Sequence, residues 1–319
     1  MTNKKFQAIN VVFYSQWDSY EKWKNILLKQ NINLYQWPDD FIKNKYYPNI
    51  NTALVWDPPE EMWKFFPKLK IIQSLGAGVD HILNKSYPKD AHIIKLSDPN
   101  LSNQMADYIL MSVLMCHRKI FQYLINKKNK DWNQIIPFDK DNFGITILGY
   151  GTIARIVIKK LKYMGCDVKV WSKTKRNPKN IQYYYGSRQL HKSIKNSSCL
   201  ISLLPNTSET NNIIGLSEFN LLRKECYFIN VGRGMTVNEQ ELIYALSNAI
   251  LSGAILDVFS KEPLNKKSKL WGLNNVFITP HIAGITNATD FTASLLKKNF
   301  HALISNKKIQ NKIINTRGY

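Results

Sequence analysis

Short apolar runs recur along the chain, and each is followed by a turn or by an amphipathic stretch. In the first hundred residues such runs cover 7–14, 52–56 and 71–75, and an amphipathic helix is predicted over 19–30. Apolar runs of this length, bounded by turn residues, are typical of strands that are buried on both faces of a parallel sheet. The pattern therefore predicts that the chain opens with an α/β fold.

A second set of apolar runs follows with a more regular spacing. Strands are predicted over 143–148, 167–171, 199–204, 227–231, 253–258 and 275–279, with helices between them over 153–164, 217–223 and 239–251. Strands that alternate with helices indicate a doubly wound parallel sheet. Ahead of this set, one long helix is predicted over 102–124. It is apolar nearly all round, which favours burial between domains or subunits.

The length of the chain sets the expected number of domains. A chain of 319 residues exceeds what one hydrophobic core usually supports, so two domains are expected. The tail after Thr286 is again helical and is expected to close the first domain. We therefore expect an α/β protein with two doubly wound parallel-sheet domains: one continuous over 102–286, and one discontinuous over 1–101 and 287–319.

The charge of the chain is strongly positive. Lysine and arginine number 44 against 23 acidic residues, a formal charge of +21. One interpretation is nucleic-acid binding, and the other is a surface rich in solvated lysine. The lysines are spread along the whole chain, without an Arg-rich helix or regular alternation with aromatic residues, which favours the second interpretation and no specific nucleic-acid partner. Such a field would still attract anionic substrates and phosphates.

Cysteine usage and hydropathy bear on the compartment. The chain has four cysteines, widely separated and without a C-x-x-C pair: Cys116, Cys166, Cys199 and Cys226. This spacing argues against a zinc site or a disulfide framework and fits reduced thiols in a cytosol. No apolar run is long enough to span a bilayer, and the first is interrupted by polar residues at 15–18. We expect a cytoplasmic protein with no metal and no membrane contact.

The segment from Gly149 to Ala154 reads G-x-G-x-x-A, directly after a predicted strand and at the start of a predicted helix. Gly149 permits a tight turn, and Gly151 lets a pyrophosphate approach the backbone, where helix N–H groups and the helix dipole favour an anion. Ala154 allows close packing of the helix on the sheet. The motif also occurs in methyltransferases and in plain turns, but its strand–turn–helix setting favours a dinucleotide site.

The next strand bears on the form of the dinucleotide. NAD sites usually place Asp or Glu roughly 20 residues after the first glycine, where it accepts a hydrogen bond from the ribose 2′-hydroxyl. Here residues 170–176 hold no carboxylate, and Ser172, Lys173 and Thr174 are followed by two more cations. A 2′-phosphate suits such a loop, so NADP(H) is preferred, with NAD(H) still possible. The other interpretation is one more basic surface loop.

Three later loops each carry a chemically active side chain after a predicted strand: Arg233, Glu262 and His281. A guanidinium can fork onto a carboxylate and also donate to a carbonyl that gains negative charge. An imidazolium ring can pass a proton near neutral pH, and a carboxylate beside it favours the charged ring. Downstream of a dinucleotide motif, this set indicates a hydride-transfer enzyme.

The sequence resembles the D-isomer-specific 2-hydroxyacid dehydrogenase family, especially its glyoxylate/hydroxypyruvate reductase A branch. The resemblance covers nearly the whole chain and is densest over 149–283, with matching segments at 203–207, 230–234, 256–259, 262–263 and 280–281. It implies a Rossmann-type cofactor domain inserted into a flavodoxin-like substrate domain. It also implies NADPH-dependent reduction of small 2-oxo acids, glyoxylate to glycolate or hydroxypyruvate to D-glycerate, by a homodimer.

The resemblance also implies roles for individual residues. Arg233 would hold the oxo-acid and stabilise the developing oxyanion, and His281, supported by Glu262, would be the general acid and base. Asp257 would hold the nicotinamide carboxamide, and the full set of implied cofactor contacts is Gly149, Gly151, Thr152, Ile153, Ser172, Lys173, Thr174, Leu204, Pro205 and Asp257. The implied substrate contacts, besides Arg233, are Trp56, Ala77, Gly78 and Val79, the last three through backbone N–H groups.

Two alternatives remain at this point. Trp56 is explained equally well as a core residue. The whole chain could instead be a dinucleotide-sensing binding protein, similar to the transcriptional corepressors that are related to this family. The positive charge mildly favours that second function.

Overall fold

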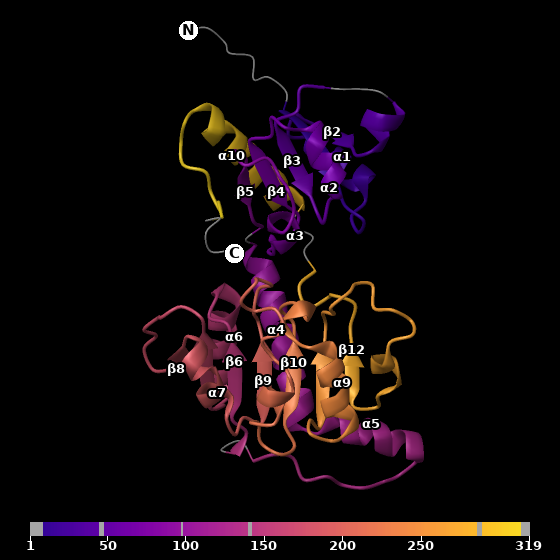
Figure 1. Cartoon of the computed structure of the whole chain (residues 1–319), viewed down its shortest axis with the longest axis vertical. Coiled ribbons are helices and arrows are strands. Elements are labelled where there is room, and N and C mark those ends of the chain that lie inside the picture. Colours follow the sequence, from indigo (N-terminus) through magenta and orange to yellow (C-terminus); the bar gives the residue numbers. More distant parts are fainter. Residues whose placement is uncertain (1–8, 45–47, 97, 140–141, 286–288, 314–319) are drawn as a thin grey trace. The chain divides into compact units, whose positions relative to one another are not determined.

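The computed structural model describes residues 9–44, 48–96, 98–139, 142–285 and 289–313. The chain divides into two compact units, one made of Met1–Asp98 with Thr286–Tyr319 and the other of Pro99–Ile285. Each unit is built on a parallel sheet with helices packed against it (Figure 1). The predicted fold class, an α/β protein with two doubly wound parallel-sheet domains, is confirmed.

The first unit contains a five-stranded sheet with the order β2-β1-β3-β4-β5. Its strands are β1 (Ile9–Tyr14), β2 (Ile32–Gln36), β3 (Thr52–Val55), β4 (Ile71–Ser74) and β5 (His92–Ile94). Its helices are α1 (Tyr20–Leu28), α2 (Glu60–Phe65), α3 (Asp80–Leu83) and α10 (Thr289–Ile304), with a π-helical turn over Asp39–Lys43. This strand order is that of the flavodoxin-like doubly wound fold, as the resemblance implied.

Each face of this sheet has its own core, because successive residues of a strand point to opposite sides. Val12 of β1 packs in a cluster with Trp63 of α2. Its neighbour Val11 packs on the other face with Leu296 of α10. The C-terminal helix therefore covers a sheet whose strands lie more than 190 residues earlier in the chain, as the helical pattern after Thr286 predicted; residues 286–288 themselves lie outside the described part.

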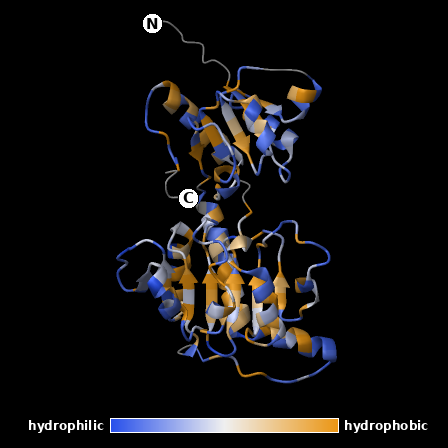
Figure 2. Cartoon of the chain, in the orientation of Figure 1, coloured by the Kyte–Doolittle hydropathy of each residue, from blue (hydrophilic) through white to orange (hydrophobic). Residues whose placement is uncertain are grey.

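The second unit contains a seven-stranded parallel sheet with the order β12-β11-β10-β9-β6-β7-β8. Its strands are β6 (Ile145–Leu148), β7 (Val168–Ser172), β8 (Gln182–Tyr185), β9 (Cys199–Ser202), β10 (Tyr227–Asn230), β11 (Gly253–Leu256) and β12 (Val276–Ile278). Its helices are α4 (Pro99–His117), α5 (Ile120–Asn129), α6 (Thr152–Tyr163), α7 (Ser187–Ile194), α8 (Leu216–Phe219) and α9 (Glu239–Ser247), with 3-10 turns over Gly234–Thr236 and Lys269–Gly272. Figure 2 shows the apolar residues concentrated on the strands.

The strands at the centre of this sheet could be predicted from the sequence because they are buried. Every residue of β6, β9, β10 and β11 is buried, and each strand holds at most one polar side chain, so these strands appear as largely apolar runs. The strands that the sequence did not predict are β2, β5 and β8, and all three are edge strands. An edge strand carries polar side chains, as in Gln182–Tyr185, and loses the continuous apolar signal.

The prediction of a single helix over 102–124 is wrong, because the helix is broken at residues 118–119, near the end of that range. Two helices occupy this stretch: α4 ends at His117, and α5 begins at Ile120. Lys119 lies between them with a left-handed backbone (φ 55°). The redirected chain buries Phe121, whose ring stacks on Tyr227 with centroids 5.9 Å apart. The apolar pattern ran on across the break because residues on both sides of it are packed on the same core.

The chain reverses direction in the second sheet at β6. From β6 it moves to β7 and β8 on one side, and later to β9, β10, β11 and β12 on the other. Loops that leave the carboxyl ends of strands on either side of such a reversal open a crevice, where α/β proteins bind their ligands. In the described part of the chain, no helix has both the length and the apolar character to cross a membrane, and no group of three or more His, Cys, Asp or Glu side chains is placed to hold a metal ion.

Candidate active site

The three predicted catalytic residues follow three neighbouring strands of the second sheet. Arg233 comes after β10, Glu262 after β11 and His281 after β12. β10 pairs with β11, and β11 pairs with β12, in both cases in parallel. Since the carboxyl ends of parallel strands meet at one edge of a sheet, all three loops leave from the same edge (Figure 1). The fold thus gathers residues that lie up to 48 positions apart in sequence.

The two glycines beside Arg233 allow its loop to pack against two other loops. A Cβ at Gly234 would lie 1.8 Å from the backbone carbonyl carbon of Phe259, in the loop that carries Glu262. A Cβ at Gly232 would lie 2.7 Å from the backbone oxygen of Leu204. Both distances exclude any side chain, because the obstructing atoms are backbone. The glycines therefore fix the loop of Arg233 between the loops after β9 and β11.

Side chains from the same segment also hold the backbone of Arg233. The side-chain amide of Asn230 donates to the Arg233 carbonyl oxygen (3.1 Å), and so does the hydroxyl of Thr236 (2.7 Å). Asn230 and Thr236 are both fully buried. The Arg233 guanidinium donates from Nη1 to the backbone oxygen of Gly232 (2.8 Å), and its side chain is half-buried. The arginine is thus anchored on a short, rigid turn before any ligand contacts it.

His281 and Glu262 form a hydrogen-bonded pair, called the His281–Glu262 pair below. The distance between His281 Nδ1 and Glu262 Oε2 is 2.7 Å. The other carboxylate oxygen of Glu262 accepts the backbone N–H of Phe259 (3.0 Å). The two side chains are 36% and 25% exposed, so water reaches the ring. The carboxylate is held at both oxygens, so it fixes Nδ1 of the imidazole on its own side and turns Nε2 away from it.

The dinucleotide fingerprint has the backbone that its glycines predicted. Gly149 has φ +107°, a left-handed conformation that favours glycine. Gly151 is the N-cap of α6, so Thr152 and Ile153 lie in its first turn. Leu204 and Pro205 follow β9, which is paired with β6, so their loop and the fingerprint leave the same edge of the sheet.

The loop that ends β7 has internal bonds that the sequence did not reveal. Ser172 is almost fully buried, and its hydroxyl donates to the backbone oxygen of Thr174 (2.9 Å). The Tyr183 hydroxyl on β8 lies 2.5 Å from Ser172 Oγ and donates to the same Thr174 oxygen (2.7 Å). Lys173 forms an ion pair with Glu209. Tyr183 and Glu209 were missed because only the pairing of β7 with β8 and the fold of the β9 loop bring them to this place.

Apart from Arg233, which lies in the second unit, the predicted substrate residues lie on adjacent loops of the first unit. Trp56 follows β3, and 76–79 follow the adjacent strand β4. A Cβ at Gly76 would lie 2.3 Å from the indole of Trp56, so the ring rests on this loop. The Ser74 hydroxyl braces the loop, donating to the Gly78 oxygen (2.8 Å) and accepting the Gly76 N–H (3.1 Å). The side chain of Val79 is buried in the core, so only its backbone is available to a ligand. Ala77 stands between the two glycines.

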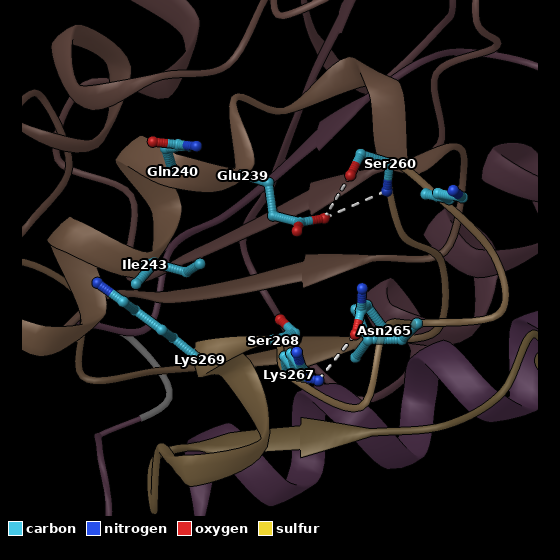
Figure 3. A pocket seen from close by; sticks show the side chains of 10 residues that line it. Glu239, Gln240, Ile243, Ser260, Asn265, Lys267, Ser268 and Lys269 are labelled. Atoms are coloured by element: carbon cyan, nitrogen blue, oxygen red, sulfur yellow. Dashed lines mark hydrogen bonds between the residues drawn. The ribbon is translucent and has the colours of Figure 1, made fainter.

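A surface pocket of about 370 Å³ adjoins the loop of Glu262 (Figure 3). Its wall includes Glu239 of α9, whose carboxylate accepts both the backbone N–H (3.3 Å) and the hydroxyl (2.7 Å) of Ser260. Arg233, Glu262 and His281 are not among the residues that line it. This bond between Glu239 and Ser260 holds the start of the loop that delivers Glu262.

The fold and the site define a class of protein: an α/β protein with a dinucleotide fingerprint at the reversal point of its larger sheet, and an arginine and a hydrogen-bonded His–Glu pair at the same edge. Residues 110–283 match the family model described as "D-isomer specific 2-hydroxyacid dehydrogenase, NAD binding domain". The chain belongs to the D-isomer-specific 2-hydroxyacid dehydrogenase family, as its motifs indicated.

Individual relatives agree with this membership. The chain is 34% identical to a glyoxylate/hydroxypyruvate reductase A of Citrobacter koseri, over 98% of this chain and 100% of that protein. It is similar to a D-isomer-specific 2-hydroxyacid dehydrogenase of Xanthobacter autotrophicus Py2, solved with NADPH and MES, at a TM-score of 0.88 and 30% identity over 98% of this chain and 100% of that one. An NADPH-dependent glyoxylate/hydroxypyruvate reductase of Sinorhizobium meliloti, solved with NADP and sulfate, also gives a TM-score of 0.88, at 25% identity over 98% and 100% of the two chains.

Proposed function

We propose that this protein reduces small 2-oxo acids with NADPH, glyoxylate and hydroxypyruvate foremost, to glycolate and D-glycerate. The observation that carries the proposal is the His281–Glu262 pair, at the same sheet edge as Arg233 and the dinucleotide fingerprint. The relatives of this chain in Citrobacter koseri and Sinorhizobium meliloti bear the names of such reductases. Those names do not favour the alternative of a corepressor-like binding protein.

The residues at the fingerprint fit a bound dinucleotide. Gly149 and Gly151 leave the first turn of α6 open to a pyrophosphate, and the backbone N–H groups of Thr152 and Ile153 would donate to it. Leu204 and Pro205 would border the rings of the bound dinucleotide. Ser172, Lys173 and Thr174 would receive a 2′-phosphate, since no carboxylate stands in residues 170–176 to repel it. A bound NADPH supplies the hydride.

Arg233 and the His281–Glu262 pair would supply the remaining chemistry. Arg233 would hold the substrate carboxylate and donate to the carbonyl oxygen as negative charge builds on it. His281 would protonate that oxygen from Nε2, because Nδ1 is occupied by Glu262. The Glu262 carboxylate would stabilise the charged ring until the proton leaves.

The other residues that we propose to contact the substrate belong to the first unit. We propose that residues 1–101 and 287–319 form the substrate domain and 102–286 the cofactor domain. The backbone N–H groups of Ala77, Gly78 and Val79 would bind the carboxylate, and Trp56 would form a wall beside them. The indole of Trp56 rests on Gly76, which favours a small acid over a bulky one.

A steady-state panel tests this function. NADPH and NADH are each assayed with glyoxylate, hydroxypyruvate, pyruvate and phenylpyruvate. We expect the highest kcat/KM for NADPH with glyoxylate or hydroxypyruvate, and the lowest with phenylpyruvate. A protein that oxidises neither NADPH nor NADH with any of the four acids would contradict the proposal.

Ser172→Asp should lower kcat/KM for NADPH by about tenfold or more and raise the relative use of NADH. A carboxylate there would repel a 2′-phosphate and could accept from a ribose 2′-hydroxyl, while Tyr183 could still donate to it. Ser172→Ala is the matched control, because it removes the hydroxyl without adding charge. An unchanged ratio of NADPH to NADH use in Ser172→Asp would show that this position does not select the cofactor.

We also propose a homodimer that forms through α4, α5 and the segment after α5. Large apolar side chains are exposed here, including Leu114 (41%), Trp132 (98%) and Ile136 (85%). Trp132→Ser together with Ile136→Ser should shift the sedimentation coefficient from dimer to monomer. Tyr163→Ser is the control, since Tyr163 is 94% exposed on α6. A wild-type protein that sediments as a monomer at micromolar concentration would refute the dimer.

A further inference from the structure

Asp257 is a buried carboxylate directly after β11, with 1% of its surface exposed. Oδ1 accepts the hydroxyl of Thr279 (2.6 Å) and the backbone N–H of Ile282 (2.7 Å), and Oδ2 accepts the backbone N–H of Ala283 (2.9 Å). A buried charge is expensive unless donors surround it. All three donors here come from the loop that carries His281, so the carboxylate binds that loop from both sides of the histidine.

The backbone of His281 needs such support. Its φ of 56° is in the left-handed region, which is unfavourable for a residue with a Cβ. Its own N–H donates to the backbone oxygen of Asp257 (2.9 Å). The next two N–H groups turn onto the carboxylate of the same residue, an arrangement in which consecutive N–H groups enclose an anion. Asp257 therefore holds the main chain from which the imidazole projects.

A second layer fixes the orientation of Thr279. The single hydroxyl proton of Thr279 is donated to Asp257, so its oxygen must accept at its other contact, the Tyr108 hydroxyl at 2.5 Å. Burial raises the pKa of Tyr108 to about 12, with a smaller contribution from the charge of Asp257. The phenol therefore keeps its proton at any pH at which the protein would work, and it donates to Thr279.

Helix α4 contacts the same loop at a second point. A Cβ at Gly284 would lie 2.7 Å from Cγ of Met105, one turn before Tyr108. The two ends of the loop, at Thr279 and at Gly284, thus both rest on α4. Met105 is therefore used in this packing.

We propose that Tyr108 and Thr279 are positioning residues that act through Asp257 to hold the His281 loop, and so direct the imidazole toward the substrate carbonyl. This proposal rests on the proposed function for its catalytic consequence. It is compatible with a carboxamide contact at Asp257, because each carboxylate oxygen has two lone pairs and Oδ2 uses one of them within the protein.

The test compares substitutions that remove one hydroxyl group with a substitution that keeps it. Thr279→Val removes the donor to Asp257 and keeps the shape, and Thr279→Ser restores the donor. Tyr108→Phe removes only the outer hydroxyl. Thr146→Val is the matched control: Thr146 is a fully buried threonine of β6 whose hydroxyl also makes two contacts, with the Ser193 oxygen (3.1 Å) and Ser197 Oγ (2.6 Å), and none with the His281 loop.

Three measurements separate the outcomes: kcat with NADPH and glyoxylate, the Kd of NADPH, and hydrogen exchange of the peptide covering 279–285 in the protein without cofactor. Thr279→Val should lower kcat by about tenfold and speed exchange of the Ile282 and Ala283 amides by about fivefold or more. The Kd of NADPH should stay within about twofold, because the fingerprint at Gly149 is untouched. Thr279→Ser should recover most of both effects, Tyr108→Phe should show smaller ones, and Thr146→Val should show neither.

Two results would overturn the proposal. The first is wild-type kcat and wild-type exchange of this loop in Thr279→Val. The second is a Kd for NADPH that weakens in proportion to kcat, which would make Asp257 a cofactor ligand and nothing more. If the wild-type protein reduces no oxo-acid, the proposed function fails, while the exchange measurement still decides whether Tyr108 and Thr279 hold the loop.

Discussion

Replacing Arg233 with alanine should lower kcat/KM for glyoxylate by about 100-fold or more. The loss combines the anchor for the substrate carboxylate with the donor to the developing oxyanion. The fold should survive, because Asn230 and Thr236 hold the turn through the backbone oxygen of residue 233, which the substitution leaves in place. The measurement is steady-state kinetics with NADPH, together with the melting temperature of both proteins.

Arg233→Lys separates charge from geometry. Lysine keeps the positive charge and loses the planar fork, so we expect it to recover only a small part of the lost activity. Arg223→Ala is the control, since Arg223 lies in the same unit and its guanidinium donates from Nη1 to the backbone oxygen of Asn142. If Arg233→Ala turns over glyoxylate at close to the wild-type rate, Arg233 has no part in the reaction.

Replacing His281 with alanine should have an effect of similar size, about 100-fold or more on kcat/KM, because it removes the proposed proton donor to the product oxygen. The kcat/KM of Glu262→Gln should lie between those of the wild type and His281→Ala. Glutamine preserves the shape of the pair and removes the charge that stabilises the protonated ring. Both variants should bind NADPH with wild-type affinity, which fluorescence titration can measure.

The same unit offers a matched control for this pair. His191 Nε2 lies 2.9 Å from Glu218 Oε1, a contact with the same chemistry at a site away from the three loops. His191→Ala should change stability slightly and leave kcat/KM unaltered. Equal losses of activity in His191→Ala and His281→Ala would mean that the effect comes from loss of fold, and would remove the catalytic assignment.

The central part of the fold could be predicted from the sequence because its strands are buried on both faces. β6, β9, β10 and β11 give largely apolar runs, and each is followed by a motif residue in the next loop. The edge strands β2, β5 and β8 could not, since solvent on one side permits polar residues there. The break at Lys119 was also hidden, because both helices around it contact the same core.

The proposed catalytic residues Arg233, Glu262 and His281 could be named from the sequence because their side chains carry characteristic acid–base and anion-binding chemistry. The hydroxyls around them do not. Tyr108 and Thr279 lie 171 positions apart, and Tyr183 contacts Ser172 only because β8 lies beside β7. The sequence does not distinguish such a tyrosine or threonine from others of its type, because its partner is close to it only in the folded chain.

The lack of clearance at Gly232 and Gly234 has a consequence for protein engineering. The loops after β9, β10 and β11 pack so closely at these glycines that not even a methyl group could be added. These loops should therefore be left unchanged in a random library. Trp56 and residues 76–79, the proposed substrate contacts, belong to the other unit of the chain. Variants that accept larger or more apolar acids are therefore best sought at those five positions, with the reactive machinery kept as it is.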